Sequence, residues 1–277
     1  MDSGIGDYNR LWVTNSLRGA CNFDISIKTL KKGIHSGKGS GIAPETFMIL
    51  RGLLARLEDS KTGLLEKFRV EIPEYYKQST EKTAKLIGKP KTPILPGVSF
   101  TEEDTTKLLL RNYWEPCLAV LGANGIPSCK EAGNVLRPET DARISIRIPP
   151  SFDCNKGMEI IDSLLENTPF NSKIAIKNKL MCNGSVVNLP SDKLKESLTK
   201  VSTAFFENDY AEIGVGGSIP VVKILTTLFP DSQFIVTGVV NTDSNIHGPN
   251  ENLNLNYCKQ FISSLSYLIS DFNNYMK

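Results

Sequence analysis

Two stretches of the chain alternate strictly between hydrophobic and polar residues. In residues 20–28 and in residues 143–148, every second side chain is apolar. The apolar positions are Cys21, Phe23, Ile25 and Ile27 in the first stretch and Ile144, Ile146 and Ile148 in the second. A period of two is typical of a strand whose sheet has one face in solvent. We therefore predict strands over 20–28 and 143–148.

Helical spacing and shorter apolar runs predict the elements around these strands. Pro44 favours the first turn of a helix, and apolar residues repeat on one helical face after it. These residues are Phe47, Leu50, Leu54 and Leu57. Further along, we expect helices over 102–112 and 153–166 and strands near 115–122 and over 172–177. This order is that of a split β-α-β sandwich, an α+β module.

The pattern changes after Pro190-Ser191. Two amphipathic helices are expected there, with apolar faces formed by Leu194, Leu198, Val201 and Phe205 and by Phe261, Leu265, Leu268 and Phe272. Between them, a helix near 218–229 precedes the almost continuously apolar run FIVTGVV at 234–240. Such a run is typical of a strand covered on both faces. This part predicts the end of an α/β sheet domain.

Composition excludes several classes of function. The chain has 277 residues, which suffice for one large domain or two of ordinary size. Its net charge is +2, from 32 basic and 30 acidic residues, so charge gives no reason to expect nucleic acid or a membrane surface as a partner. No apolar run approaches the ~18 residues of a membrane span.

Cysteine usage and the amino terminus bear on the cellular compartment. The six cysteines include no CxxC pair, and their spread favours reduced thiols over a disulfide framework. The first ten residues, MDSGIGDYNR, have neither the basic start nor the apolar core of a signal peptide. We therefore expect a cytoplasmic protein.

Six short motifs occur along the chain in a fixed order. They are DSG at 2–4, RLWVTNSLRG at 10–19, HSG at 35–37, SIRIPP at 145–150, GGSIP at 216–220 and HGPNE at 247–251. Together they resemble the metallopeptidase family that includes cytosolic non-specific dipeptidase, carnosinase, aminoacylase and glutamate carboxypeptidase. The resemblance covers nearly the whole chain.

The resemblance implies a specific domain organisation. The family has an α/β catalytic domain in two pieces, with an inserted α+β, ferredoxin-like lid that also mediates dimerisation. By analogy, residues 1–18 and 188–277 are the retained, incomplete parts of the catalytic domain, and residues 19–187 are the lid. A homodimer formed through the lid is expected.

Two residues correspond to zinc ligands in the family. Asp2 offers a carboxylate, and His247 offers an imidazole just beyond the strand expected at 234–240. Both are ordinary zinc donors, and ligands collect beyond the carboxyl ends of strands in open α/β sheets. The alternatives are a solvated aspartate in a DSG turn and a loop histidine without a special role.

His35 and Arg147 correspond to residues that contact the substrate. The resemblance implies that His35 reaches across the dimer and donates a hydrogen bond to the scissile carbonyl of the partner's site. It also implies that Arg147 binds the substrate carboxylate, which suits a planar, permanently charged guanidinium. The alternatives are a surface loop histidine and a solvated strand arginine like Arg143.

Asn134, Gly217 and Ser218 complete the substrate-binding set. Asn134 stands where the dipeptidases carry a threonine, and its amide is able to donate a hydrogen bond. Gly216, Gly217 and Ser218 precede a helix, where backbone N–H groups favour an anion; the alternative is an ordinary serine N-cap. Val215 replaces a glutamate that is frequent in the dipeptidases, so any contact from there to a substrate amino group is lost.

The family mechanism needs more donors than these. It uses two zinc ions, five ligand residues and a general-base glutamate. Only Asp2 and His247 correspond to ligands here, so we expect less than one equivalent of tightly bound zinc and no dipeptide hydrolysis by this chain alone. Three readings stay open: part of a zinc peptidase or amidohydrolase, a non-catalytic dimerising or binding subunit, and an inactive truncated product. Peptidase and aminoacylase chemistry are not distinguished.

Overall fold

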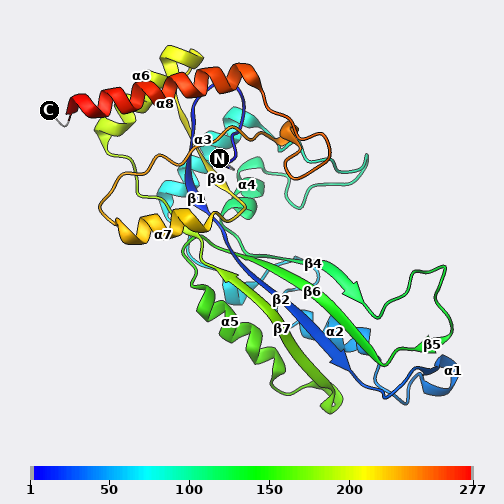
Figure 1. Cartoon of the computed structure of the whole chain (residues 1–277). Coiled ribbons are helices and arrows are strands. Elements are labelled where there is room, and N and C mark those ends of the chain that lie inside the picture. Colours follow the sequence, from blue (N-terminus) through cyan, green and yellow to red (C-terminus); the bar gives the residue numbers. More distant parts are fainter. Residues whose placement is uncertain (1–2, 276–277) are drawn as a thin grey trace. The chain divides into compact units, whose positions relative to one another are not determined.

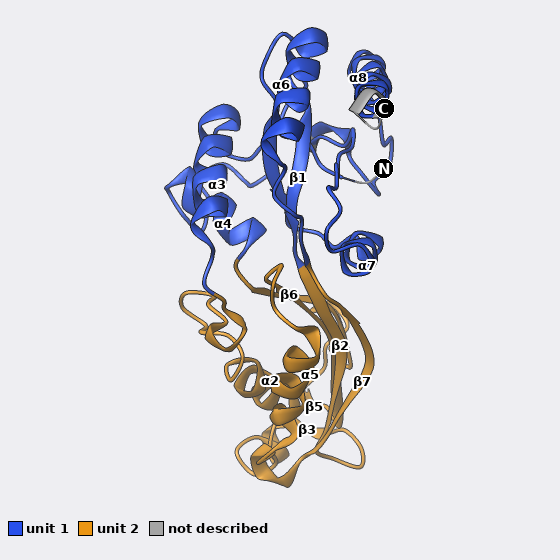
Figure 2. Ribbon diagram, turned by 90° about the vertical axis from the view of Figure 1, so that its left-hand side faces the viewer, with its two compact units in different colours: residues 1–18, 71–114, 185–277 blue, residues 19–70, 115–184 orange. Residues whose placement is uncertain are grey.

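A computed structural model describes residues 3–275, without the side chains of residues 242 and 273–275. The chain forms two compact units, coloured separately in Figure 2. Unit 1 comprises residues 1–18, 71–114 and 185–277, and unit 2 comprises residues 19–70 and 115–184. Residues 71–114 therefore pack with the terminal parts, whereas the sequence analysis placed them in the lid.

Unit 2 is built on a four-stranded antiparallel sheet with the order β4-β6-β2-β7. The strands are β2 (Gly19–Lys28), β4 (Cys117–Asn124), β6 (Glu139–Ile148) and β7 (Lys173–Cys182). Both alternating stretches are strands, and β2 pairs with β6 so that Phe23 lies opposite Ile144. On the apolar face, the side chains of the central strands β2 and β6 are buried, while Asp24 and Arg143 form an ion pair on the polar face.

Two helices cover the apolar face of this sheet, as Figure 1 shows for α2 (Thr46–Leu54) and α5 (Cys154–Asp162). They contribute Ile49, Leu53 and Ile161 to the same core as the strands. The first helix begins at Thr46 because Glu45, not Pro44, holds the N-cap position and accepts from the backbone N–H groups of Phe47 and Met48.

Beyond the end of β2, the chain forms a small two-stranded ribbon. It consists of β3 (Ile34–His35) and β5 (Val135–Leu136), with the one-turn helix α1 (Ser36–Gly39) beside it. A Cβ atom on Gly39 would lie 2.4 Å from Ile34 Cδ1 and 2.7 Å from Leu136 Cδ1. A larger residue at Gly39 would therefore have to displace these two side-chain tips beside the turn that presents His35.

Unit 1 has a three-stranded sheet with the order β8-β1-β9. The strands β1 (Trp12–Leu17) and β9 (Ala211–Val215) are parallel, and β8 (Ser185–Val186) pairs antiparallel with β1. The helices are α3 (Glu74–Ile87), α4 (Thr105–Tyr113), α6 (Asp192–Phe206), α7 (Pro220–Leu228) and α8 (Leu255–Tyr275). Short 3-10 turns occupy Glu66–Phe68, Ser163–Leu165, Pro169–Asn171 and Thr242–Ser244. Within the described residues, no helix combines the length and apolar character that a membrane crossing requires.

The strand expected over 234–240 is not regular, and that prediction was wrong. The segment runs along β1 through two bonds, from the Thr14 N–H to the Val236 carbonyl (2.7 Å) and from the Thr237 hydroxyl to the Trp12 carbonyl (2.6 Å). A parallel bridge joins Val240 to Gly4. The segment is half-buried beside β1 without a regular strand ladder. Its apolar sequence therefore reflects burial and not regular β-pairing.

Candidate functional site

Arg147 lies near the carboxyl end of β6, opposite Ala20 of β2 and Cys117 of β4. Its side chain is half-buried and shares the polar face of the sheet with Arg143. Arg143 is held by Asp24, whose Oδ1 lies 2.8 Å from the arginine Nε. This ion pair sets the guanidinium of Arg143 beside a carboxylate, and the role of Arg147 in binding the substrate carboxylate stays a prediction.

The imidazole of His35 is exposed and has a defined tautomer. Its Nδ1 accepts a hydrogen bond from the backbone N–H of Gly37 at 3.1 Å. That bond requires an unprotonated Nδ1, so the neutral ring carries its proton on Nε2. Nε2 is therefore the atom able to donate to a carbonyl oxygen, as the predicted role requires.

The ribbon brings Asn134 next to His35. The Asn134 carbonyl accepts from the Ser36 N–H at 2.8 Å, and His35 pairs directly with Val135. Two segments that are about a hundred residues apart in sequence thus present one exposed polar surface. The structure unites two of the predicted substrate-binding residues.

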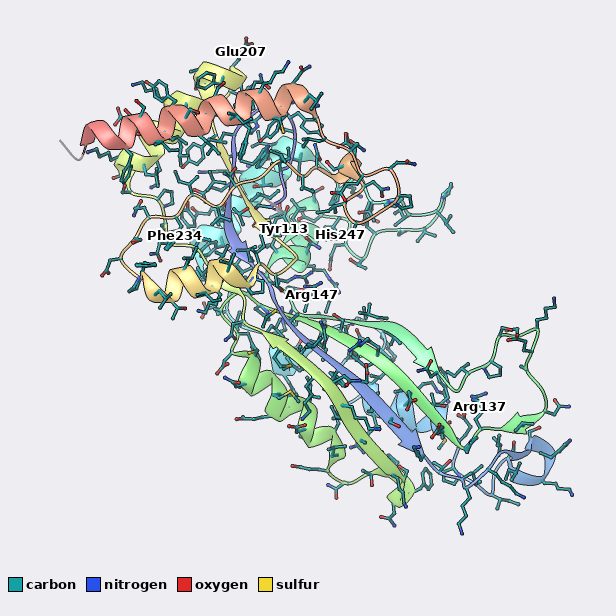
Figure 3. All side chains as sticks on the ribbon, in the orientation of Figure 1. Tyr113, Arg137, Arg147, Glu207, Phe234 and His247 are labelled. Atoms are coloured by element: carbon teal, nitrogen blue, oxygen red, sulfur yellow. The ribbon has the colours of Figure 1, made fainter. Side chains whose placement is uncertain are left out.

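Arg147 and the His35–Asn134 ribbon lie far apart within unit 2. The ribbon adjoins the amino end of β6 at Glu139, and a strand rises ~3.3 Å per residue, which places Arg147 roughly 26 Å farther along. Figure 3 shows Arg137 and Arg147 at opposite ends of this sheet. A dipeptide spans only about 7 Å, so His35 and Arg147 of one chain cannot both contact the same dipeptide.

In unit 1, Gly216, Gly217 and Ser218 form the turn between β9 and α7. The N-cap position belongs to Ile219, which makes no side-chain capping bond, so the reading of Ser218 as an ordinary N-cap is wrong. The buried Arg18 donates from Nε to the Gly216 carbonyl at 3.0 Å. A turn held in this way can direct N–H groups at an anion.

His247 is exposed in the loop that follows the 234–240 segment. Its backbone has a left-handed φ of 61°, and its N–H donates to Glu251 Oε2 at 3.1 Å. Asp2 lies outside the described residues. The bridge between Gly4 and Val240 places the residues that follow Asp2 beside those that precede His247.

The described residues do not fit a two-zinc centre by themselves. From residue 3 to residue 275, no group of three or more histidine, cysteine, aspartate or glutamate side chains is placed to hold a metal ion. His247 has no such companions among them. We therefore derive no catalytic step through zinc from this geometry.

Sequence comparison relates the chain to dipeptidases, although no family model matches it. It is 24% identical over 250 residues to the cysteinylglycine-S-conjugate dipeptidase of Corynebacterium striatum, covering 87% of this chain and 52% of that protein. It is 26% identical over 257 residues to the Beta-Ala-His dipeptidase of Mus musculus, covering 87% and 50%. The chain thus spans about half the length of the curated relatives it matches.

Structure comparison gives the same answer. Human carnosine dipeptidase 1 superposes with a TM-score of 0.70 at 17% identity, covering 95% of this chain and 57% of that one. An M20 family metallo-carboxypeptidase, Sso-CP2 from Sulfolobus solfataricus, superposes with a TM-score of 0.73 at 17% identity, covering 96% and 61%. This chain is related in sequence to dipeptidases and shares the fold of an M20 family peptidase. The predicted resemblance and the α/β fold class are confirmed, and the relatives are hydrolases.

The site also contains features that the sequence motifs did not indicate. Arg18, which ends the RLWVTNSLR motif, is only 5% exposed and holds the Gly216 turn. Asn112 contributes to the same turn, because a Cβ atom on Gly216 would lie 2.8 Å from its Oδ1. A charged residue directly after the uncharged run LWVTNSL at residues 11–17 was the available signal for Arg18.

A second polar cluster lies near the other end of β9 from the Gly216 turn. At the start of β9, Glu212 accepts from the Tyr75 hydroxyl at 2.6 Å and from Asn15 Nδ2 at 3.1 Å. Burial raises the pKa of Tyr75, and the hydrogen bond to Glu212 raises it further. Gly216 and Ser218 follow the carboxyl end of β9, where ligands of such sheets bind, so we regard the Glu212 cluster as structural.

Proposed function

We propose that this chain supplies the substrate-recognition half of a zinc-dependent peptidase that hydrolyses dipeptides or N-acyl amino acids with a free carboxylate. The observation that carries the proposal is the similarity of 87% of the chain to two different dipeptidases. In this assignment, unit 2 is the inserted lid and unit 1 corresponds to a part of the catalytic domain.

The residues of this chain would contact the substrate at its carboxylate and at its scissile carbonyl. Arg147 offers a planar fork for the substrate carboxylate, and the turn at Gly217 and Ser218 offers backbone N–H groups to an anion. His35 donates from Nε2 to the carbonyl oxygen as negative charge develops there. These groups bind and orient the substrate and stabilise the transition state.

Metal chemistry needs donors in addition to these. Zinc would polarise the carbonyl and activate water, and a catalytic zinc normally takes three protein ligands. Asp2 and His247 are two candidate donors on this chain. We therefore propose that the chain does not hydrolyse dipeptides by itself.

The distance between His35 and Arg147 supports a homodimer formed through unit 2. Because one chain cannot bring both residues to a dipeptide, His35 would serve the site of the second copy. The exposed position of the ribbon and its Nε2 donor are compatible with that reach.

A second candidate function is a non-catalytic dimerising or binding subunit of a complete relative. It is favoured by the match to about half of each relative together with the small donor set. In both functions the lid mediates association. They differ in whether hydrolysis depends on the residues of this chain.

One experiment tests the proposal and separates the two functions. The purified chain is assayed for bound zinc and dipeptide hydrolysis, alone and after co-expression with the part of a dipeptidase that it does not match. We expect little zinc and no turnover alone, and turnover in the complex that is lost with His35→Ala. Robust zinc-dependent hydrolysis by the chain alone would contradict the proposal. Association with a complete dipeptidase whose turnover is indifferent to His35→Ala would favour the subunit function.

A further inference from the structure

Two helices of unit 1, α7 and α8, each expose a stripe of apolar side chains to solvent. The exposed residues recur at helical spacing along one face of each helix. They are Val221, Ile224, Leu225 and Leu228 on α7, and Leu255, Ile262, Ile269 and Phe272 on α8. Leu228 is 65% exposed and Ile269 is 73% exposed. Single exposed apolar residues are ordinary, whereas a continuous apolar stripe is typical of a binding surface.

Both helices also bury a second apolar face inside unit 1. Val222 of α7 is buried in a cluster with Leu17 of β1. On α8, the buried side chains include Tyr257, Phe261 and Leu268. A helix that is apolar on all sides is typical of the inside of a protein and not of its surface. The exposed stripes are therefore additional to the faces by which α7 and α8 hold unit 1 together.

The helix α3 shows how the same unit forms a face for solvent. Its exposed side carries ion pairs such as that of Glu81 and Lys85, whose Oε1 and Nζ lie 2.6 Å apart. By contrast, α7 contains one charged residue and α8 contains two. One of these, Asp271, accepts a hydrogen bond from the Ser197 hydroxyl of α6 at 2.7 Å and so is directed toward α6. The exposed faces of α7 and α8 are thus poor in the charged groups that solvate α3.

The two stripes lie on the same side of the unit 1 sheet. Figure 2 shows α7 and α8 on one side of β1, and α3 and α4 on the other. Among the described residues, this sheet has three strands, and the 234–240 segment beside β1 has no regular ladder. The side of unit 1 that carries α7 and α8 therefore offers apolar surface to further polypeptide.

The dipeptidase relatives contain further polypeptide of this kind. Human carnosine dipeptidase 1 shares its fold with 95% of this chain, but the match covers 57% of that protein. The two curated dipeptidases are matched over 52% and 50% of their lengths. Helices and strands in the rest of such a protein need apolar surface to pack against. Unit 1, which corresponds to a part of the catalytic domain in the proposed function, offers this surface on α7 and α8.

We propose that the apolar stripes of α7 and α8 are the docking surface for a polypeptide equivalent to the part of a dipeptidase that this chain does not match. Docking would remove Ile224, Ile262 and Ile269 from water, and the partner would present apolar side chains to them. The proposal takes the identity of the partner from the proposed function. It concerns association and not hydrolysis, so the two are tested by different measurements.

The test is co-expression of the full chain with the unmatched part of the Corynebacterium striatum dipeptidase, followed by purification on a tag carried by that part. We expect a complex of defined stoichiometry, whose dissociation constant is measured by sedimentation on dilution. Ile224→Glu and Ile269→Glu should each weaken the complex by about 30-fold or more, because a charge would be buried at the centre of the contact. Neither change should lower the unfolding temperature of the chain alone, since both positions are exposed and glutamate suits a helix.

Leu180→Glu is the matched control for these variants. Leu180 lies on β7 in unit 2 and is 63% exposed, so the same type of change there should leave association unaltered. A complex that depends on Ile224 and Ile269 but hydrolyses no dipeptide would contradict the proposed function and leave the docking surface in place.

Three outcomes would overturn the docking proposal. The first is that the wild-type chain forms no complex with the unmatched part. The second is that Ile224→Glu and Ile269→Glu weaken the complex no more than Leu180→Glu does. The third is that the chain alone self-associates in sedimentation and Ile269→Glu abolishes this, which would show that a second copy covers the stripes.

Discussion

At the scale of single residues, two arginines on one face of β6 have different surroundings. Arg143 is paired with Asp24 on the neighbouring strand, and Arg147 lies at the end of the strand beyond that pair. Sequence alternation alone gave both residues the same face and could not separate them. The motif SIRIPP pointed to Arg147, and its role stays a prediction that the pair of variants below tests.

Arg147→Ala should weaken ligands with a free carboxylate. In the reconstituted enzyme we expect KM for a dipeptide to rise about 10- to 100-fold, because a charge-assisted, two-pronged hydrogen bond is lost. The matched control is Arg143→Ala, which removes the same charge from the same strand face and should change KM little. Equal effects of the two variants would contradict the assignment, and so would an undiminished preference for a free over an amidated carboxyl terminus.

Residue roles were predicted from the sequence more readily than residue neighbours. The motifs identified His35 and Asn134 separately, but no local pattern predicted that the Ser36 N–H would bind the Asn134 carbonyl. That contact depends on pairing between β3 and β5, each of only two residues. Such short strands carry no periodic signal, so the ribbon appears only in the folded chain.

At the scale of elements, the sequence pattern predicted the amphipathic helices and strands. It did not predict a strand that is buried on all sides or a helix whose buried face contains polar residues. Every residue of β1 is buried, including Thr14 and Ser16, so the strand shows no alternation. The buried face of α3 includes Thr80 and Thr83, whose hydroxyls bond to the carbonyls of Tyr76 and Glu212. A helix whose buried face carries hydroxyl groups lacks the apolar stripe by which an amphipathic helix is recognised in a sequence.

Gly19→Ala should destabilise the start of β2. A Cβ atom at this position would lie 2.6 Å from both the Cys182 carbonyl oxygen and the Gly184 nitrogen, and backbone atoms cannot yield as a side-chain tip can. We expect a loss of about 2–4 kcal/mol in the free energy of unfolding, measured by urea denaturation.

Gly52→Ala is the matched control for that substitution. Gly52 lies in α2, and a Cβ atom there would meet nothing within 4 Å. Alanine should therefore stabilise the helix by about 0.5–1 kcal/mol. Unfolding curves of Gly19→Ala and Gly52→Ala that shift in the same direction would contradict this account of the two glycines.

At the scale of the whole molecule, buried tyrosines link stability to alkaline pH. Burial raises the pKa of Tyr76 and of Tyr210 to about 12, and it raises the pKa values of Tyr75, Tyr113 and Tyr257 as well. The ordinary tyrosine pKa is about 10, so the folded chain keeps protons that the unfolded chain releases. The stabilisation is complete below pH ~10 and is lost as pH rises through the raised pKa values.

The unfolding temperature should therefore fall steeply above pH ~10. Phenolate absorbance should rise late in the native protein and coincide with unfolding, whereas the chain in denaturant should titrate near pH ~10. Calorimetry and a spectroscopic pH titration check both parts. Phenolate formation at the ordinary pKa without loss of structure would contradict the burial of these rings.

Mixing two impaired variants tests the proposed dimer. In the reconstituted enzyme at substrate concentrations well below KM, His35→Ala should lower the rate by ~10²–10³-fold because a donor to the developing oxyanion is lost. Arg147→Ala should lower the rate there through its raised KM. A mixture that exchanges subunits should recover about a quarter of the wild-type activity, since half of the dimers carry one intact site of two. If the subunits are shown to exchange and the mixture still regains no activity, both residues act in the site of one chain.

The length of β6 between the ribbon and Arg147 has a kinetic consequence. If His35 of each subunit completes the active site of its partner, a folded monomer has no catalytic activity. Specific activity should then decline on dilution below the dissociation constant of the pair. A subunit lacking His35 would disable the centre of the healthy subunit it joins, while its own centre would use the healthy imidazole, so a mixed pair would keep one active centre of two. In a cell that makes both forms in equal amounts, about half of the activity would remain, and the defect would not be dominant.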